Sequence, residues 1–437
     1  MRARDVTYPS SGWRIGLPLT LLPVAVALYA PLQARGPEPV VRVLLKEAPL
    51  VEVGVAGSVP LQLRDDGGRS LLEIVPGQRM RLRSAKGGLQ AELVSARGGA
   101  KVVPLPLRQA WIDPKPGSGS LLLLDNRRFR GRLKLRPAGK RLQAINVVGL
   151  ETYLSSVVGS EMPASWPQEA LRAQAVAART YALRQRKPDA PFDLKATVAS
   201  QVYKGVEAET PSTRQAVAST RSQVLMHGSS LIDAVFHSSS GGVTENSGDI
   251  WTRQLPYLVS VPDFDEASPV RRWEKRLEPA ELRKAFPELG GLTDLDVLRT
   301  SRSGRIQLAR VTGPRGTQVI KGAELRKRLG LRSTLVTFRF EAPEPAAVSG
   351  DPRTAAAIVP PPLPLLPDIL PRTAQASLAA ALRPEASPAL VARGRGFGHG
   401  VGMSQWGAYG MAQRGRSHEE ILRHFYRGVA VRTYTGR

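Results

Sequence analysis

Glu161 is the residue of this 437-residue chain whose type and setting best suit acid–base chemistry. It stands in the sequence Glu161-Met162-Pro163, which interrupts two stretches with helical character, so we expect it at a corner between helices. Largely nonpolar surroundings raise the pKa of a carboxyl group and suit it to general acid catalysis. The structural alternative is a carboxylate that complements the dipole at a helix start.

The histidines and serines offer weaker chemistry. The chain has no cysteine, no His-x-x-x-His and no His-Glu-x-x-His, so we predict no metal site and no cofactor. His237 precedes three serines, Gly241 and Gly242, a run that suits either a loop touching a polar ligand or an ordinary turn. A serine hydrolase is the weaker hypothesis, because the Gly-x-Ser-x-Gly turn is missing and no orienting carboxylate can be placed.

The stretch GRGFGHGVGMSQWGAYG, residues 394–410, has a glycine at every second position from Gly394 to Gly402. It lacks the Gly-x-x-x-x-Gly-Lys-Ser/Thr pattern of a phosphate loop. Alternate glycines leave one face of an extended segment bare, so that a sugar ring or another stretch of backbone can lie against it. Both alternatives stay open, and in the first the sugar contacts would come from Phe397, His399, Trp406 and Tyr409.

The elements that must position these residues are of mixed type. Residues 40–144 consist of short β-type runs separated by turn signals, which predicts a small antiparallel sheet or barrel-like module. An alanine-rich core helix is expected from about Trp166 to Gln185, opened by a capping box of Ser165 and Gln168. Further helices are expected near 212–219 and 403–414, and a second capping box at Ser417 and Glu420 opens another helix. The fold class is therefore α+β, with a mixed, mostly antiparallel sheet and a central helix after the β-rich module.

The start of the chain predicts export. Three arginines precede an uncharged, mostly apolar run at 15–32, so residues 1–34 read as a signal peptide or an N-terminal membrane anchor, with the protein in the periplasm or cell envelope. Residues 145–340 then form the expected catalytic core, 341–390 a proline- and alanine-rich linker or insertion, and 391–437 the segment that completes the core.

The charge balance indicates the kind of partner. The chain has 62 Lys and Arg against 37 Asp and Glu, a formal net charge of +25. An excess of this size favours an anionic partner such as an acidic wall polymer or lipid, unless it only reflects an arginine-rich proteome. Nucleic acid is not expected, because the basic residues do not cluster with aromatic ones.

Four blocks of the sequence resemble a known family. They are GLETYLSSVVGSEMPASWPQEALRAQAVAARTYAL, SQVYKG, VFHSSSGGVTE followed by YLVSVPD, and GRGFGHGVGMSQWGAYGMAQRG. In this order they are similar to the stage II sporulation protein D and LytB-type amidase-enhancer family of cell-wall proteins. The resemblance implies a lytic transglycosylase that cleaves peptidoglycan glycan strands stripped of stem peptides, with Glu161 as its acid and base.

The same resemblance implies a set of glycan contacts and two alternatives to catalysis. Some family members bind zinc through histidine and cysteine, which the lack of cysteine argues against here. The protein would otherwise be an enhancer of an N-acetylmuramoyl-L-alanine amidase, or a structural peptidoglycan-binding protein. The glycan cleft would be lined by His237, Ser239, Ser240, Gly241, Gly242, His399 and Gln405, with Tyr203 and Trp406 as stacking walls.

Overall fold

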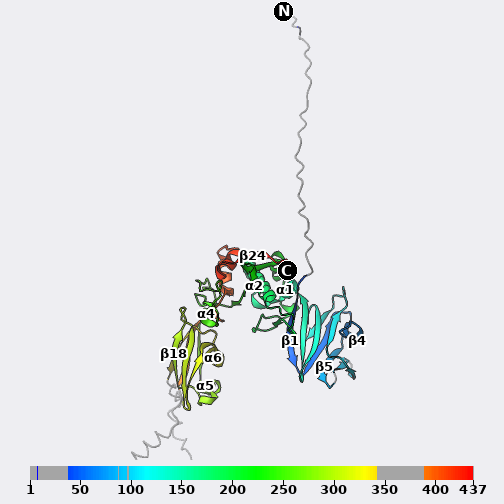
Figure 1. Ribbon diagram of the computed structural model, residues 1–437, viewed down its shortest axis with the longest axis horizontal. Helices are drawn as coiled ribbons and strands as arrows, with labels where there is room; N and C mark the ends of the chain where they lie inside the picture. Colours follow the sequence, from blue (N-terminus) through cyan, green and yellow to red (C-terminus); the bar gives the residue numbers. More distant parts are fainter. Residues whose placement is uncertain (1–6, 8–37, 87, 96–97, 342–387, 437) are drawn as a thin grey trace, which may run out of the picture. The chain divides into compact units, whose positions relative to one another are not determined.

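The computed structural model of the protein describes Thr7 and residues 38–86, 88–95, 98–341 and 388–436 (Figure 1). The predicted export segment and nearly all of the predicted linker at 341–390 lie outside these residues. In the part of the chain that is described, no helix has the length and apolar character needed to cross a bilayer.

The β-rich front of the chain folds into two sheets that share one apolar core. One sheet has the order β13 (Leu194–Lys195), β1 (Val40–Ala48), β12 (Arg141–Gly149), β11 (Arg132–Ala138), β8 (Ala110–Pro114), β3 (Leu61–Arg64) and β4 (Ser70–Ile74). The other has the order β10 (Arg127–Phe129), β9 (Leu121–Leu124), β2 (Leu50–Ala56), β5 (Arg79–Ala85), β6 (Gly88–Val94) and β7 (Ala100–Leu105). Neighbouring strands are antiparallel except β1 and β13, and alternate residues such as Val41 and Val43 are buried, as a period of two requires.

Helices follow directly on β12 and place the candidate acid. They are α1 (Leu150–Glu161), α2 (Gln168–Arg184), η1 (Val206–Ala208) and α3 (Pro211–Ser219). The alanines of α2 are fully buried, and this helix packs against α1 and α3, so the predicted central alanine-rich helix is confirmed. Small side chains allow such close packing on several sides of one helix.

The capping box predicted for α2 is wrong. Pro167 is the N-cap residue, and the first turn receives no hydrogen bond from a capping side chain. The helix begins two residues beyond the position that the Ser165–Gln168 pattern requires, because the chain first makes a turn in which the Trp166 N–H bonds to the Pro163 carbonyl.

The C-terminal segment completes the same core. It comprises β23 (Met403–Ser404), α8 (Gln405–Gln413), α9 (His418–Phe425) and β24 (Ala430–Thr433). Strand β23 pairs in parallel with β16 (Phe236–His237), and β24 pairs with β14 (Gln223–His227), which also pairs with β15 (Ser230–Leu231). The capping box at Ser417 and Glu420 is confirmed at the start of α9. The short helix α4 (Ser247–Ile250) lies in the intervening loops.

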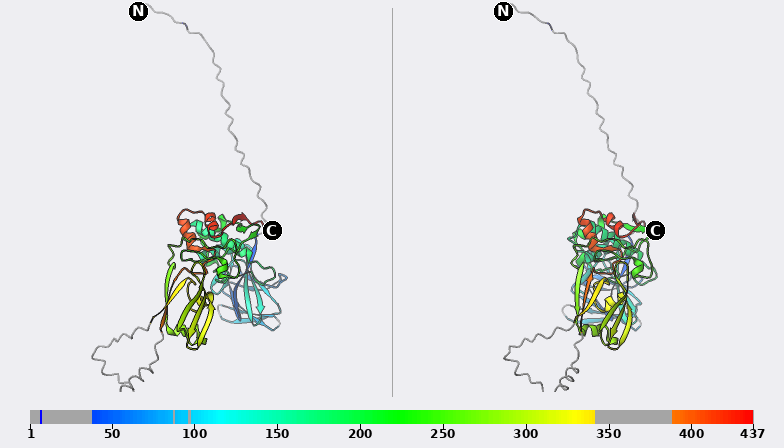
Figure 2. Two further views of the ribbon diagram at one scale, coloured as in Figure 1. Left: turned by 60° about the vertical axis from the view of Figure 1, so that its left-hand side comes forward. Right: turned by 90° about the vertical axis from the view of Figure 1, so that its left-hand side faces the viewer.

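A second, separate apolar core forms from residues 272–341 and 389–395. Its first sheet has the order β17 (Arg272–Leu277), β22 (Ala389–Arg395) and β21 (Val336–Glu341), and its second β18 (Asp294–Thr300), β19 (Ile306–Gly313) and β20 (Gly316–Lys321). It also contains α5 (Pro279–Ala285), η2 (Pro287–Leu289) and α6 (Gly322–Arg328). Figure 2 shows the late strand β22 among these earlier strands. The fold class, α+β with mostly antiparallel sheets, is confirmed.

Candidate active site

Glu161 lies at the end of α1 with both carboxylate oxygens engaged. Its Oε1 accepts the backbone N–H of Val202 at 2.8 Å, and its Oε2 accepts the side-chain amide Nε2 of Gln405 at 3.1 Å. Burial raises the pKa of Glu161, while these two hydrogen bonds and the charge of Lys204 oppose part of the rise. The carboxyl group is thus held in one orientation and biased toward its protonated form.

Two local features bring the partners of Glu161 into place. At Gly159 a Cβ atom would lie 1.9 Å from the Ala208 carbonyl oxygen, so the absence of a side chain lets η1, which follows the loop that carries Val202, pack against α1. Gln405 is the first residue of α8, whose N-cap Ser404 accepts a hydrogen bond from the Gly407 N–H at 3.1 Å. The helix start therefore fixes the backbone from which Gln405 reaches Glu161.

An aromatic cluster adjoins this pair. The ring centroid of Trp166 lies 4.7 Å from that of Trp406 and 5.0 Å from that of Tyr409, and the last two rings are 5.4 Å apart. All three side chains are half-buried, and Trp406 follows Gln405 directly. The cluster offers the apolar surface on which a sugar face can pack. Trp166 was missing from the predicted set, although its place five residues after Glu161 is visible in the sequence.

Tyr203 is not a stacking wall. Its side chain is 3% exposed, its hydroxyl donates to Asn146 Oδ1 at 2.9 Å, and its ring packs against Phe129 and Tyr153. Burial raises the pKa of this phenol. At residues 202–203, the backbone N–H of Val202 donates a hydrogen bond to Glu161. The ring of Tyr203 instead packs in the core next to Phe129 of the β-rich module.

The predicted serine and histidine contacts face inward. His237 Nδ1 is 3.2 Å from the Val401 carbonyl oxygen, so this nitrogen carries the proton and Nε2 accepts from Ser240 Oγ at 2.8 Å. Ser239 Oγ donates to Asp265 Oδ2 at 2.5 Å. Burial lowers the pKa of His237 well below its ordinary value. These side chains hold the loop together and do not line a cleft.

Gly241 and Gly242 form the turn directly after the three serines. Both have positive φ, 79° and 111°, which favours glycine, and a Cβ at Gly241 would lie 2.7 Å from the Cβ of Arg395. The Gly241 N–H donates to Asp265 Oδ2 at 2.7 Å. Gly241 is buried, so the structure assigns it a packing role in place of the predicted glycan contact.

A buried pair of aspartates, missed in the sequence, organises this loop. Asp263 Oδ2 accepts the Ser240 N–H at 3.2 Å, and Asp263 is also hydrogen-bonded to Ser404, the N-cap of α8. Asp265 lies 3.3 Å from Arg271 Nε. Burial, and then the charge of Asp265, raise the pKa of Asp263 to about 7. The signal was present as alternate aspartates directly after the strand-like run 257–261.

The alternating glycines are explained by close packing. A Cβ at Gly394 would lie 2.1 Å from the Trp273 ring, one at Gly398 2.7 Å from His237 Cβ, one at Gly400 2.5 Å from Arg305 Cζ and one at Gly402 2.2 Å from the Val235 carbonyl oxygen. Of the two alternatives, the structure therefore favours a tight crossing of chain segments over an open floor for a sugar.

His399 is part of that crossing. Its Nε2 lies 3.1 Å from the Phe236 carbonyl oxygen, and its Nδ1 accepts the Val401 N–H at 3.1 Å. Burial lowers the pKa of His399 to about 4. Both ring nitrogens are thus engaged with backbone, and the predicted polar contact of this histidine with a glycan is not supported.

Comparisons with known proteins decide the family. A profile described as stage II sporulation protein, SpoIID, matches residues 138–227. Stage II sporulation protein D of Bacillus subtilis (strain 168) is 30% identical over 309 residues, which cover 66% of this chain and 76% of that protein. The chain belongs to the SpoIID family.

Two other relatives of this SpoIID chain differ in how much of them it covers. An uncharacterized protein of Brachyspira hyodysenteriae is 30% identical over 314 residues, 71% of this chain and 74% of that protein. The amidase enhancer of Bacillus subtilis (strain 168) is 29% identical over 305 residues, 64% of this chain and 40% of the enhancer. The resemblance drawn from the four sequence blocks is thereby confirmed.

Of the site residues predicted for this SpoIID protein, the fold brings Glu161 and Gln405 into contact and places Trp406 beside them. Their catalytic and binding roles stay predictions. Among the described residues, no group of three or more His, Asp or Glu side chains is arranged to hold a metal ion.

Replacing Asp263 by asparagine is expected to change how stability depends on pH. The folded-state pKa of about 7 lies above the ordinary value of 3.8, so the folded state binds more protons than the unfolded state between these values. The contribution of the protonated carboxyl is therefore present below the lower value and lost as the pH rises through the upper one. An asparagine side chain does not ionise in this range, so the variant does not share this loss of stability. Its free energy of unfolding relative to wild type should therefore rise from about pH 4 to about pH 8 in urea titrations. A difference that does not change with pH would contradict this assignment.

Proposed function

We propose that this protein is a lytic transglycosylase that cleaves peptidoglycan glycan strands stripped of stem peptides, with Glu161 as its acid and base. The observation that carries the proposal is the Glu161 carboxyl group, partly buried, oriented by two hydrogen bonds and raised in pKa. These are the properties expected of a group that must donate a proton near neutral pH and then accept one. The SpoIID relatives support the coarser statement of a cell-wall-related role.

The first step is protonation of the glycosidic oxygen. Glu161 in its acid form donates its proton to the oxygen that leaves, while the bond from this oxygen to C1 of the muramic residue breaks. The leaving strand keeps that proton as a new hydroxyl group. The Val202 N–H stabilises the carboxylate that remains, because its hydrogen bond to Oε1 strengthens when charge develops there.

The second step closes a ring within the same sugar. The C6 hydroxyl oxygen of the muramic residue bonds to C1, and its proton passes to the Glu161 carboxylate, which restores the acid. The product is a 1,6-anhydro-muramic end, and no water is consumed. The side-chain amide of Gln405 has both donor and acceptor atoms, so it can pair with either protonation state of Glu161.

A single carboxyl group is sufficient for this sequence of steps. A hydrolytic glycosidase uses two carboxyl groups, one for the leaving oxygen and one for the nucleophile or water. The carboxylates nearest to Glu161 in the sequence are engaged elsewhere, since Glu151 pairs with Arg179 and Glu169 pairs with Arg172 and His418. This arrangement favours the intramolecular attack over hydrolysis.

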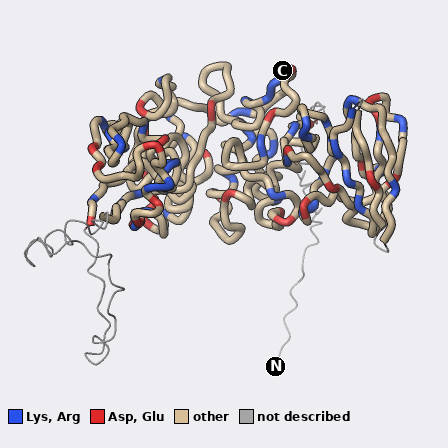
Figure 3. Tube along the Cα trace, turned by 90° about the horizontal axis from the view of Figure 1, so that it is seen from below, with Lys and Arg blue, Asp and Glu red and all other residues tan. Residues whose placement is uncertain are grey.

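We also propose that the protein is exported and acts in the cell envelope. The proposal rests on the basic residues and the apolar run at 15–32. A net charge of +25 would then favour association with the anionic wall. Figure 3 shows Lys and Arg distributed over the described chain and interspersed with Asp and Glu, which fits broad attraction better than one basic patch.

Cleavage should depend on pH in the direction set by Glu161. Because burial raises its pKa, Glu161 keeps its acid form to a higher pH than an ordinary glutamate, and this fraction falls as the pH rises through the folded-state pKa. We expect kcat/KM for glycan cleavage to fall with increasing pH along this limb. The measurement is initial rates on stripped strands over a pH series, and a kcat/KM that rises steadily into the alkaline range would contradict the acid role.

An enhancer of an amidase is the second candidate. The observation that favours it is the similarity to the protein named amidase enhancer. An enhancer would leave stripped strands uncut and would raise the activity of a purified N-acetylmuramoyl-L-alanine amidase on intact peptidoglycan.

One experiment separates the candidates. Purified protein is incubated with amidase-stripped strands, and the soluble products are analysed by mass spectrometry. Anhydro-muramic ends would establish the lytic transglycosylase, and reducing ends would indicate a hydrolase. Binding without any product, together with stimulation of the amidase in a parallel assay, would leave the enhancer.

A further inference from the structure

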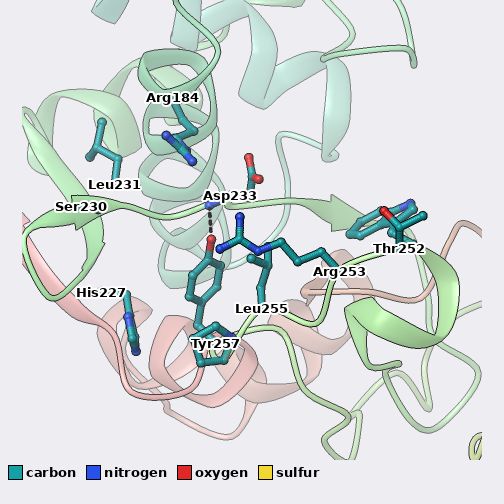
Figure 4. A pocket seen from close by; sticks show the side chains of 11 residues that line it. Arg184, His227, Ser230, Leu231, Asp233, Thr252, Arg253, Leu255 and Tyr257 are labelled. Atoms are coloured by element: carbon teal, nitrogen blue, oxygen red, sulfur yellow. Dashed lines mark hydrogen bonds between the residues drawn. The ribbon is translucent and has the colours of Figure 1, made fainter.

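A pocket of about 480 Å³ lies away from Glu161 and is not used by the proposed mechanism (Figure 4). It is formed where the last residue of α2, Arg184, approaches the loops around Asp233 and 251–257. Figure 4 shows the side chains of Arg184 and Arg253 extending toward the centre of the pocket, where Asp233 and the hydroxyl of Tyr257 also lie.

The guanidinium groups of Arg184 and Arg253 are available to a ligand. Both side chains are exposed, and within the described part of the chain neither makes a hydrogen bond or an ion pair through its guanidinium group. The other arginines of α2 differ, since Arg172 pairs with Glu169 and Arg179 with Glu151. Two free guanidinium groups that converge on one cavity are suited to an anionic group, which they bind through charge-assisted hydrogen bonds.

The remaining lining is suited to a sugar. The Tyr257 hydroxyl accepts the Asp233 N–H at 3.1 Å, which leaves its own proton for a ligand oxygen. Asp233 Oδ1 accepts from Gln185 Nε2 at 3.4 Å, and its other oxygen is free within the described residues to accept a sugar hydroxyl. Trp251 is 40% exposed as a residue, and its ring supplies an apolar face.

The charge of the pocket selects among anions. Two guanidinium groups and the Asp233 carboxylate leave a formal excess of one positive charge, with His227 counted as neutral. A monocarboxylate balances this excess of one, whereas a phosphate dianion would leave a net negative charge in the pocket. The composition therefore favours a sugar that carries one carboxylate.

The pocket is connected to the candidate active site through packed side chains. The Trp251 ring lies 5.4 Å from the His399 ring, which lies 5.3 Å from the His237 ring. His237 pairs with Ser404, the residue before Gln405, and Gln405 donates to Glu161. A ligand stacked on Trp251 would thus be separated by that ring from the glycine crossing, which leads through β23 into α8.

We propose that this pocket binds an acidic pyranose, with Arg184 and Arg253 on its carboxylate and Trp251 against its ring. The assignment to a wall sugar rests on the proposed function. A muramic residue without a stem peptide has a free lactyl carboxylate, so the pocket would recognise a strand at a unit distant from the bond that is cleaved.

Direct binding of monosaccharides tests this proposal. The full chain is titrated with N-acetylmuramic acid, with N-acetylglucosamine, which lacks the lactyl carboxylate, and with lactate, which lacks the ring, and binding is followed by calorimetry or NMR. We expect N-acetylmuramic acid to bind at least about tenfold more tightly than either other probe. Equal affinity for N-acetylglucosamine, or for lactate, would overturn the proposal.

Matched variants locate the site. Arg184→Ala with Arg253→Ala should weaken binding of N-acetylmuramic acid at least about tenfold. Arg186→Ala, which removes an exposed positive charge two residues from Arg184 and outside the pocket, should leave the affinity unchanged. If the control variant loses as much affinity for N-acetylmuramic acid as the double variant, binding depends on the overall charge of the protein and the proposed site is wrong.

The same variants separate this inference from the proposed function. If the protein cleaves stripped strands, the double variant should raise KM about tenfold and leave kcat nearly unchanged, because Arg184 and Arg253 do not touch the reacting bond. If the wild-type protein cleaves stripped strands and the double variant has the same KM, the proposed sugar site in the pocket is wrong, while the transglycosylase proposal stands. If the wild-type protein binds N-acetylmuramic acid specifically but cleaves no stripped strands, the transglycosylase proposal is wrong, while the proposed sugar site stands.

Discussion

Replacing Glu161 by glutamine is expected to lower the rate of glycan cleavage by about 10²–10⁴-fold, the contribution typical of general acid–base catalysis. Glutamine has nearly the same shape and can still accept the Val202 N–H through its side-chain oxygen. It has no proton to give to the leaving oxygen and cannot take one from the C6 hydroxyl. The measurement is the rate at which anhydro-muramic ends form from stripped strands, followed by mass spectrometry.

The matched control is Glu169→Gln, which makes the same change at a glutamate in the first turn of α2. Glu169 bonds to Arg172 and His418 and makes no contact with Glu161 or Gln405. We expect this variant to keep cleavage within a few-fold of wild type. If Glu161→Gln retains the wild-type rate, or if both variants lose it equally, Glu161 is not the acid.

Replacing Arg305 by alanine is expected to destabilise the fold by about 3–5 kcal/mol, the usual result of removing one partner from a buried ion pair. Arg305 and Glu245 are both fully buried, with Arg305 Nε 4.0 Å from Glu245 Oε2. Glu245 Oε2 also accepts hydrogen bonds from the hydroxyl groups of Ser301 and Ser303. Without the guanidinium group, this carboxylate would remain buried with no opposite charge beside it.

The arginine also connects distant parts of the chain. Its Nη2 donates to the Ser240 carbonyl oxygen at 2.7 Å, and its guanidinium group lies against Gly400. Burial lowers the pKa of Arg305 to about 10, which still leaves it charged at neutral pH. Its loss should therefore loosen both the serine loop and the glycine crossing.

Urea unfolding, followed by circular dichroism, measures this effect. The control is Arg310→Ala in β19, the strand that begins directly after Arg305, where the side chain is about half exposed and pairs with Asp296 at 3.5 Å. An exposed pair of this kind contributes about 0–1 kcal/mol. A loss in Arg305→Ala no greater than in Arg310→Ala would show that the buried pair does not stabilise the fold.

Local patterns in the sequence were sufficient for the elements that depend on neighbouring residues. The alanines of α2, the capping box at Ser417 and the alternation in β1 each express a preference of a short segment, and the structure follows them. The box at Ser165 failed because Pro163 and Pro167 set a turn first, a competition that residue spacing alone does not reveal.

The sequence by itself determined the family and singled out Glu161, because the blocks around Glu161 and the glycine run are contiguous and specific. Only the tertiary structure decided what surrounds them. Glu161 and Gln405 are 244 positions apart, and whether Tyr203 stacks on a ligand or fills the core depends on Asn146 and Phe129. Burial, pKa shifts and the purpose of alternate glycines all follow from contacts between segments remote in the chain, which no local pattern encodes.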